Sequence, residues 1–427
     1  MLSSRLPKDL SPSPFFAELE RAKAESAPFI DMTVSTPVKA GLPVELDAAV
    51  DEGRGSFDCW NPDAAGWKSA REAVVEYYRE RGGNFTAGQI LLTASTSEAY
   101  SVLFKTFCDS GDVILTPMPG YPLLDTLAQL EHLECAPYFL QLKREKSSFR
   151  FVLDSDSLLA APEKAKILLL VSPHNPTGHC VSREEWNIAV RFCEENDMVL
   201  VVDEVFGDYG FSNKVSRTWK YVFGTCHPER QSIYETSQLV DLVELGSKEQ
   251  DLWDAGGNDL INLPENGPKC PIFWLNGLSK AVGSPQLKLG WMAFYAPRER
   301  FEEIRAALEF VEDAYLSVSA PAQALGTALL KQSAAYESRV KGRLLQNWQT
   351  LREAFSAKYC PEVLGGWYAV VRLGEDDEEL TLRLLKEKHV LVQPGFFFDF
   401  DEDGWVVISL LQEPATFKEA VQRMKAL

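Results

Sequence analysis

The chain has 427 residues, 45% of them hydrophobic, and a formal net charge of −19 at pH 7. This length allows a large buried core and more than one domain. The acidic balance argues against nucleic acids and anionic membrane surfaces as partners, and no apolar run is long enough to span a membrane. Since the N-terminus also lacks a signal-peptide pattern, we expect a cytoplasmic protein.

Cysteine and histidine spacing gives no indication of a metal site. The eight cysteines are scattered and form no C-x-x-C pair. His174 and His179 are separated by a Pro and a Gly, so they do not share a helix face. We therefore expect reduced cysteines and no bound metal.

Short apolar runs alternate with helical patterns over the first 300 residues. The predicted strands are 89–93, 112–116, 166–172, 198–204, 271–276 and 290–296, and the predicted helices are 67–81, 97–108 and 183–195. Most of these strands are continuously apolar, which is typical of strands buried on both faces. The repetition predicts an α/β fold, with a mostly parallel sheet flanked by helices and ligands bound at the carboxyl ends of its strands.

The C-terminal part has a different pattern, that of a smaller α+β unit. Its predicted helices are 298–316, 321–333, 334–358, 377–388 and 414–426, and its predicted strands are 367–373, 390–393 and 404–411. The predicted domains are an N-terminal arm that forms part of the small domain (1–45), a large domain (46–300), and a small C-terminal domain with an interdomain helix (301–427).

The alternation of strand and helix patterns in the large domain stops at about 212–268, a segment with no clear strand pattern. Loops of this length are uncommon unless they are functional or flexible. The second half of the segment is acidic and partly helical in pattern. It is interpreted either as a surface insertion or as a lid or partner-binding element.

Two charged residues follow apolar strands closely enough to suggest chemistry. Asp203 ends a strongly apolar strand, where a carboxylate is costly unless it meets a cation or strong donors. A bound protonated heterocycle, a helix cap or an ion pair would each meet that need. Lys280 follows a strand through a short turn, where burial can make its amine a neutral nucleophile. Lys288, in the loop that follows, is interpreted as an anion contact.

Three further strand ends carry polar or aromatic side chains. Asn175 offers an amide to a ligand, although Asn-Pro also marks an ordinary turn. Ser95, Thr96 and Ser97 begin a helix, where their hydroxyl and N–H groups suit either a phosphate or simple N-capping. Tyr121 lies in a turn after the next strand and could stack on a planar ring.

In combination these segments resemble the class I/II aminotransferase group of fold type I pyridoxal-phosphate enzymes. The strongest matches are N-P-T-G at 175–178, D-E-V-F at 203–206 and the S-K…K-x-G-W pattern at 279–291. The resemblance extends from about residue 30 to 425, without the insertion. It implies pyridoxal 5′-phosphate as cofactor and a homodimer with active sites at the subunit interface.

The same resemblance implies a role for each candidate residue. Lys280 forms a Schiff base with the cofactor, and Asp203 faces its pyridine nitrogen. Asn175 donates to the phenolate oxygen, and Tyr121 stacks on the ring. The phosphate is held by four side chains: Ser95, Thr96, Ser97 and Lys288.

Four positions depart from the family pattern. Lys288 stands where the group usually has a phosphate-binding Arg, so charge is kept but bidentate geometry is lost. Gly277 replaces a frequent Ser. Phe206 replaces a Tyr, and a phenyl ring cannot donate to the phenolate oxygen. Val407 stands where an Arg commonly binds the substrate carboxylate.

Two residues are candidates for substrate contacts. Arg372, in a nearby predicted strand, could replace the missing Arg, or it is an ordinary surface arginine. Trp60 falls near the place where the family often has a Tyr that reaches the phosphate of the neighbouring subunit. A substrate amine without the usual carboxylate is the other explanation for Val407.

The leading hypothesis is a pyridoxal-phosphate-dependent aminotransferase that moves an amino group between an amino acid or amine and a keto acid. One alternative is another reaction of the same fold type, such as C–S bond elimination. The other is a binding or regulatory protein that has lost catalysis.

Overall fold

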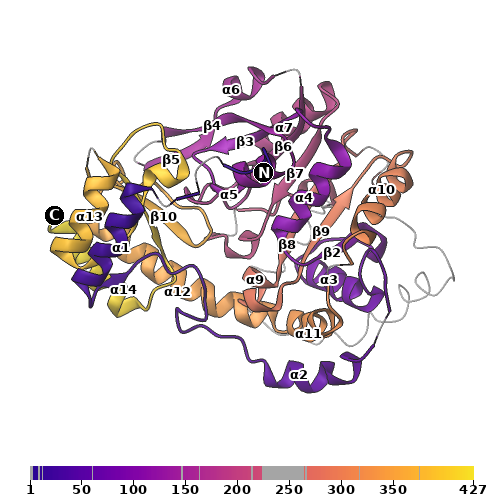
Figure 1. The fold of residues 1–427 in the computed structure, drawn as a ribbon, viewed down its shortest axis with the longest axis horizontal. Helices are drawn as coiled ribbons and strands as arrows, with labels where there is room; N and C mark the ends of the chain where they lie inside the picture. The colour runs from indigo at the N-terminus through magenta and orange to yellow at the C-terminus, as the bar shows by residue number, and fades with distance from the viewer. Residues whose placement is uncertain are drawn as a thin grey trace, which may run out of the picture.

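The computed structural model describes residues 3–7, 10–11, 13–59, 61–145, 148–162, 164–212, 215–223, 264, 267–316, 318–374 and 376–427. Its centre is an eight-stranded sheet (Figure 1). In spatial order the strands are β2 (Ile90–Thr93), β9 (Gly290–Tyr295), β8 (Ile272–Gly277), β7 (Val199–Asp203), β6 (Ala165–Val171), β3 (Val113–Met118), β4 (Glu134–Glu145) and β5 (Ser148–Leu153).

The direction of the strands fixes where a site can form. β8, β7, β6, β3 and β4 run parallel, while β9 is antiparallel to both β8 and β2, so β2 shares the common direction. The carboxyl ends of β2, β3, β6, β7 and β8 therefore meet at one edge. All six strands predicted for this region are present, and the predicted mostly parallel α/β sheet is confirmed.

The predicted helices of the large unit form at nearly the expected bounds: α3 (Lys68–Glu80), α4 (Thr96–Phe107) and α7 (Arg183–Glu195). Local capping explains where two of them begin. Ser95 Oγ accepts a hydrogen bond from the Glu98 N–H at the start of α4. At the start of α7, Ser182 and Glu185 form a reciprocal capping box, which satisfies two backbone donors without intrahelical partners.

The C-terminal unit has a three-stranded antiparallel sheet in the order β10 (Tyr368–Arg372), β13 (Trp405–Ser409) and β12 (Gln393–Pro394). The helices predicted for this part of the chain are α10 (Phe301–Asp313), α11 (Ala320–Leu330), α12 (Ser333–Ala354), α13 (Asp377–Lys388) and α14 (Pro414–Lys425). In Figure 1, α13 and α14 lie together at the end of the molecule where the C-terminus is marked.

The N-terminal arm joins this C-terminal unit. Its strand β1 (Ile30–Asp31) pairs in parallel with β11 (Val390–Leu391). Its helix α1 (Pro14–Ser26) lies alongside α13 (Figure 1), and Phe15, Leu19 and Ala22 are buried there. The assignment of residues 1–45 to the small domain and the division at residues 45 and 300 stay predictions.

The first part of the 212–268 segment belongs to the core. Trp219 is fully buried and packs edge-on against Tyr78, and α8 (Lys220–Phe223) follows it directly. Most of the remainder lies outside the described residues. The interpretation of this segment as a lid or partner-binding element falls on those residues. Within the described ranges, no helix is long and apolar enough to cross a membrane.

Candidate active site

A cavity of about 300 Å³ lies at the sheet edge where the parallel strands end. Nine residues predicted from the sequence line it: Ser95, Thr96, Ser97, Tyr121, Asn175, Asp203, Phe206, Lys280 and Lys288. They lie at or after the carboxyl ends of β2, β3, β6, β7 and β8, so the strand order itself brings them together. The cavity is also lined by Ser35 of the N-terminal arm and Tyr368 of the C-terminal sheet.

Lys280 lies in α9 (Leu278–Ala281), a single helical turn that directly follows β8. Its Nζ donates to the Ser35 carbonyl at 3.4 Å, and it lies 4.5 Å from the ring centre of Trp367 and 5.2 Å from that of Phe206. Burial lowers the pKa of Lys280 to about 8, while the Asp203 carboxylate acts in the opposite direction. A substantial share of this amine is therefore neutral near pH 8.

Asp203 is the last residue of β7, the strand next to β8. Its Oδ1 accepts the Val205 N–H at 3.0 Å, and its Oδ2 accepts the Tyr100 hydroxyl at 2.7 Å. Burial raises the pKa of Asp203, and these two hydrogen bonds oppose the effect. A carboxylate fixed in this way beside a cavity is suited to a cationic group, such as a protonated ring nitrogen.

The turn between β2 and α4 is suited to an anion. Thr96 and Ser97 occupy the first turn of α4, whose unpaired backbone N–H groups and dipole favour negative charge. The Ser95 hydroxyl already caps the helix by accepting from Glu98 N. Lys288, in a left-handed backbone conformation with φ of 51°, lines the same cavity and adds a positive charge.

Gly277 has a structural reason for lacking the frequent Ser side chain. It lies opposite Gly290 in the β8–β9 pair. A Cβ at Gly277 would lie 3.0 Å from the Gly290 Cα, and one at Gly290 would lie 3.0 Å from the backbone of Ser95. The two glycines therefore let β8, β9 and the turn before α4 approach closely beneath the anion site.

Asn175 tests whether these residues suit the cofactor implied by the sequence. Its Oδ1 is buried and has no hydrogen-bond partner among the described residues. Buried polar atoms are rarely left unpaired, and a flip of the side chain exchanges the oxygen and the NH₂ group, so this amide is suited to a polar ligand that either donates or accepts. Together with the Lys280 amine, the Asp203 carboxylate and the α4 N-terminus, the amide fits pyridoxal phosphate. Within the described ranges no group of three or more metal-ligating side chains is found.

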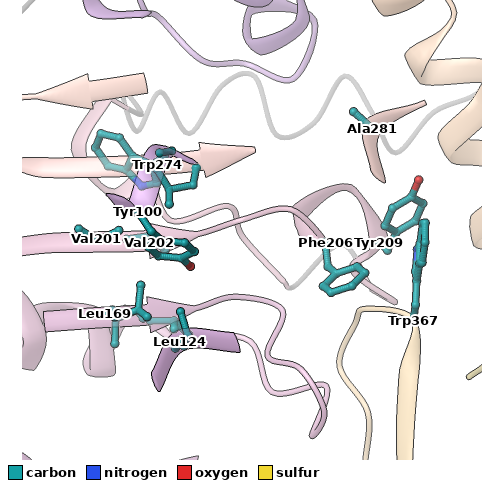
Figure 2. Close-up of a cluster of buried hydrophobic side chains, with 14 of the residues drawn as sticks. Tyr100, Leu124, Leu169, Val201, Val202, Phe206, Tyr209, Trp274, Ala281 and Trp367 are labelled. Carbon is teal, nitrogen blue, oxygen red and sulfur yellow. The ribbon is translucent and has the colours of Figure 1, made fainter. Parts of the chain in front are cut away.

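Aromatic rings enclose the amine of Lys280 on one side. Figure 2 shows Phe206, Tyr209 and Trp367 together, and the Trp367 ring centre lies 5.4 Å from that of Phe206 and 5.2 Å from that of Tyr209. Phe206 and Trp367 are both buried. These rings cover one side of Lys280 and so contribute to the burial that lowers its pKa.

Two substrate-related positions lie apart from this group. Arg372 pairs with Glu402 through exposed side chains and does not line the cavity. Val407 is fully buried in the middle of the C-terminal sheet, opposite Val370. Trp60 lies outside the described residues.

Sequence reasoning missed four residues around the site. Tyr100 bonds Asp203, Tyr209 bonds the carbonyl of Lys280, and Ser35 and Tyr368 line the cavity. Tyr100 alone had a local signal, because it lies one helical turn beyond Thr96 and so faces the same way. The other three come from distant parts of the chain, and no spacing connects them with Lys280.

Comparisons with known proteins agree with this geometry. The chain matches the family Aminotransferase class I and II over residues 60–424. It is 22% identical over 424 residues to a glutamate-pyruvate aminotransferase of Haemophilus influenzae, covering 96% of this chain and 93% of that protein. Nicotianamine aminotransferase A of Hordeum vulgare is 24% identical over 415 residues, covering 93% and 78%.

Solved structures of aminotransferases have the same fold. A solved structure of an alanine aminotransferase from Pyrococcus furiosus superposes with a TM-score of 0.77 at 19% identity, covering 100% of this chain and 99% of that one. A Thermus thermophilus aspartate aminotransferase variant gives 0.74 at 21% identity. Since the family match spans most of the sequence, the chain belongs to the class I and II aminotransferases, which use pyridoxal phosphate for transamination.

Proposed function

We propose that this aminotransferase binds pyridoxal phosphate as a Schiff base on Lys280 and transfers an amino group between an amino donor and a keto acid. The observation that carries the proposal is that Lys280 and Asp203 lie at the same cavity. They follow neighbouring parallel strands and line one cavity. One supplies an amine of lowered pKa and the other a fixed carboxylate.

Each of these residues would contact a different part of the cofactor. Asp203 would accept a hydrogen bond from the protonated ring nitrogen, and Asn175 would donate its amide to the phenolate oxygen. Tyr121 would cover one face of the ring. The phosphate would be held at the start of α4 by a cluster of side chains: Ser95, Thr96, Ser97 and Lys288.

When bound, pyridoxal phosphate supplies the electron sink that stabilises negative charge on the substrate carbon. Lys280 then moves the proton. Its Nζ, once free of the cofactor, would take a proton from the substrate carbon and return it to C4′ of the cofactor. A pKa of about 8 suits this task, because general acid–base catalysis works best when the pKa lies near the operating pH.

The substrate side of the proposal is less specific. Arg372 stays a candidate for the substrate carboxylate only if its pairing with Glu402 is broken. Trp60 stays a candidate for contact with a neighbouring subunit. The proposal includes a cytoplasmic homodimer, and light scattering of the purified protein measures the assembly.

Substitution of Lys280 tests the attachment. Lys280→Ala should remove the visible absorbance of the Schiff base and nearly all turnover, whereas Lys331→Ala, an exposed lysine paired with Glu52, should retain both. Borohydride reduction followed by mass spectrometry should label the wild-type peptide at Lys280. A reducible bond that persists in Lys280→Ala would refute the attachment.

A spectral screen against amines and amino acids tests the reaction. Conversion to the pyridoxamine form should identify donors. Ammonia and a keto acid released without an added keto-acid acceptor would indicate elimination instead.

A further inference from the structure

A buried ionic cluster lies directly behind the strand ends that carry Asp203 and Lys280. Glu204, the residue after Asp203, accepts Arg217 Nε at 2.7 Å, and Arg217 Nη1 donates to Asp208 Oδ1 at 2.8 Å. Arg81 Nε donates to the same oxygen at 2.8 Å. Arg81 Nη2 also donates to Glu337 Oε2 at 3.1 Å. Three carboxylates thus face two guanidinium groups in a region where unpaired charge is costly.

Asp208 connects this cluster to β8. Its Oδ2 accepts the Tyr77 hydroxyl at 2.7 Å, and that hydroxyl accepts Asn276 Nδ2 at 3.1 Å. Asn276 lies in β8 and its Oδ1 accepts the Gly277 N–H at 2.7 Å. The side chains of Tyr77 and Asn276 therefore link Asp208 to the end of β8, which α9 follows directly.

The residue after Asp208 contacts the catalytic turn itself. The Tyr209 hydroxyl donates to the Lys280 carbonyl at 2.6 Å. Figure 2 shows this hydroxyl on the side of the ring that faces Ala281, the last residue of α9. Carbonyls in the last turn of a helix have no intrahelical partner, so this bond fixes the end of a very short helix.

Packing leaves this pair little freedom. Tyr209 is fully buried, and its backbone carbonyl accepts the Gly366 N–H at 3.0 Å, next to Trp367. Gly207 has no room for a side chain, because a Cβ there would lie 2.4 Å from the guanidinium carbon of Arg217. The turn at 207–209 is therefore fixed on both sides.

We propose that Asp208 and Tyr209 are positioning residues for the reaction, which hold the α9 turn so that the Lys280 amine stays in reach of the substrate carbon. The proposal rests on the proposed role of Lys280. Neither residue lines the cavity, so neither touches the reacting groups. Their effect is exerted through the Lys280 carbonyl and through the Tyr77–Asn276 link.

Tyr209→Phe tests the pair directly, since it keeps the ring and removes only the hydroxyl. We expect kcat to fall about 10- to 100-fold, because a small displacement of a catalytic group has effects of this size. The KM for the amino donor should change less than kcat. Asp208→Asn, which keeps the size of the side chain, should change kcat in the same direction.

A second readout needs no bound cofactor. Competitive acetylation of the apoprotein at different pH values, read by mass spectrometry, gives the pKa of the Lys280 amine. Burial lowers that pKa in the wild type. A loosened α9 turn would admit water, so the pKa should rise toward the ordinary lysine value in Tyr209→Phe.

Tyr78→Phe is the matched control. Tyr78 is buried like Tyr209. Its hydroxyl accepts a hydrogen bond from Trp291 Nε1 at 3.1 Å and makes no hydrogen bond to Lys280. This variant should lose thermal stability without the fall in kcat or the rise in the Lys280 pKa. If Tyr209→Phe and Tyr78→Phe behave alike in both readouts, the positioning role is overturned.

The outcomes separate this inference from the proposed function. If borohydride labels a residue other than Lys280 in the wild type, the proposed function fails. If Lys280 is labelled but Tyr209→Phe keeps wild-type kcat and Lys280 pKa, only the positioning role fails. Should Tyr209→Phe not fold, Tyr77→Phe removes the other link to β8, and unchanged kcat there overturns the proposal equally.

Discussion

At the scale of single residues, the lowered pKa of Lys280 has a direct consequence for cofactor uptake. Only the neutral amine attacks an aldehyde, and burial places the pKa of this amine at about 8. The rate at which the apoprotein takes up pyridoxal phosphate should therefore rise with pH and reach half its maximum near pH 8. Stopped-flow absorbance measures this rate. A half-maximum near pH 10, as for a solvated lysine, would contradict the buried environment.

Phe206 should set the protonation behaviour of the bound cofactor. It is buried and its ring centre lies 5.2 Å from Lys280 Nζ. Phe206→Tyr adds a donor that can stabilise the anionic phenolate oxygen and so favour the unprotonated Schiff base. The pH midpoint of the visible absorbance should fall by about one unit, the size expected for a hydrogen bond to a charged group. Phe206→Leu adds no donor and should not lower the midpoint.

The position of a residue at the sheet edge was predictable where it follows a strand end, and a contact with a remote partner was not. Asp203 and Lys280 end or follow apolar strands, so the strand pattern alone places them at one sheet edge. The carbonyl of Ser35, by contrast, accepts Lys280 Nζ across 245 positions of sequence. No pattern in either segment indicates this contact, because it depends on how the N-terminal arm folds back.

At the scale of elements, loss of one member of the cluster of Arg217, Glu204 and Asp208 should cost more stability than loss of one member of an exposed pair. Burial raises the pKa of Asp208, but Arg81 and Arg217 lower it further, so the net shift is downward. A carboxyl group whose pKa is lower in the folded than in the unfolded state stabilises the fold at pH values above the unfolded-state pKa. This contribution is lost as the pH falls below about 4. At neutral pH the Asp208 carboxyl group is ionised.

Arg217→Met should therefore reduce the free energy of unfolding by about 3–5 kcal/mol at pH 7, because it leaves buried carboxylates without their partner. Urea unfolding measures the loss. The matched control is Arg372→Met, whose pair with Glu402 is exposed and should be worth less than about 1 kcal/mol. Equal losses in the two variants would mean that solvent reaches the cluster.

Two of the strands missed by sequence reasoning, β4 and β5, have a weak apolar pattern. β4 and β5 form an antiparallel pair at the edge of the large sheet, and their sequence ECAPYFLQLKRE…SFRFVL mixes charged and apolar residues. An edge strand has one neighbour and a more exposed surface, so it needs less continuous hydrophobicity than a central one. The central strands were predictable because burial on both faces leaves few polar positions.

Arg217 and Trp219 show the same limit in a segment interpreted as an insertion. Their surroundings, S-R-T-W-K-Y-V-F, have no strand pattern, yet Trp219 is fully buried and Arg217 bonds two carboxylates of the core. Burial of these two residues depends on partners near Tyr77 and Asp208, which belong to other elements. Local sequence does not contain that information.

At the scale of the whole molecule, the cavity joins three parts of the chain. Ser35 comes from the N-terminal arm, Tyr368 from the C-terminal sheet, and the remaining lining from the large unit. A ligand that fills this cavity should therefore stabilise the contacts among all three parts, and not only the large sheet.

Removal of the cofactor should for this reason lower the midpoint of thermal unfolding of the whole chain as one transition. A ligand at 100 times its Kd stabilises the native state by about 2.7 kcal/mol, so the shift should grow with the logarithm of added pyridoxal phosphate. Differential scanning calorimetry measures both the shift and the number of transitions. Inorganic phosphate is the control, because it can occupy the start of α4 but cannot reach Tyr368 or Ser35. If phosphate alone reproduced the full shift, the stabilisation would arise at the anion site, and the three parts would not be coupled through the cavity.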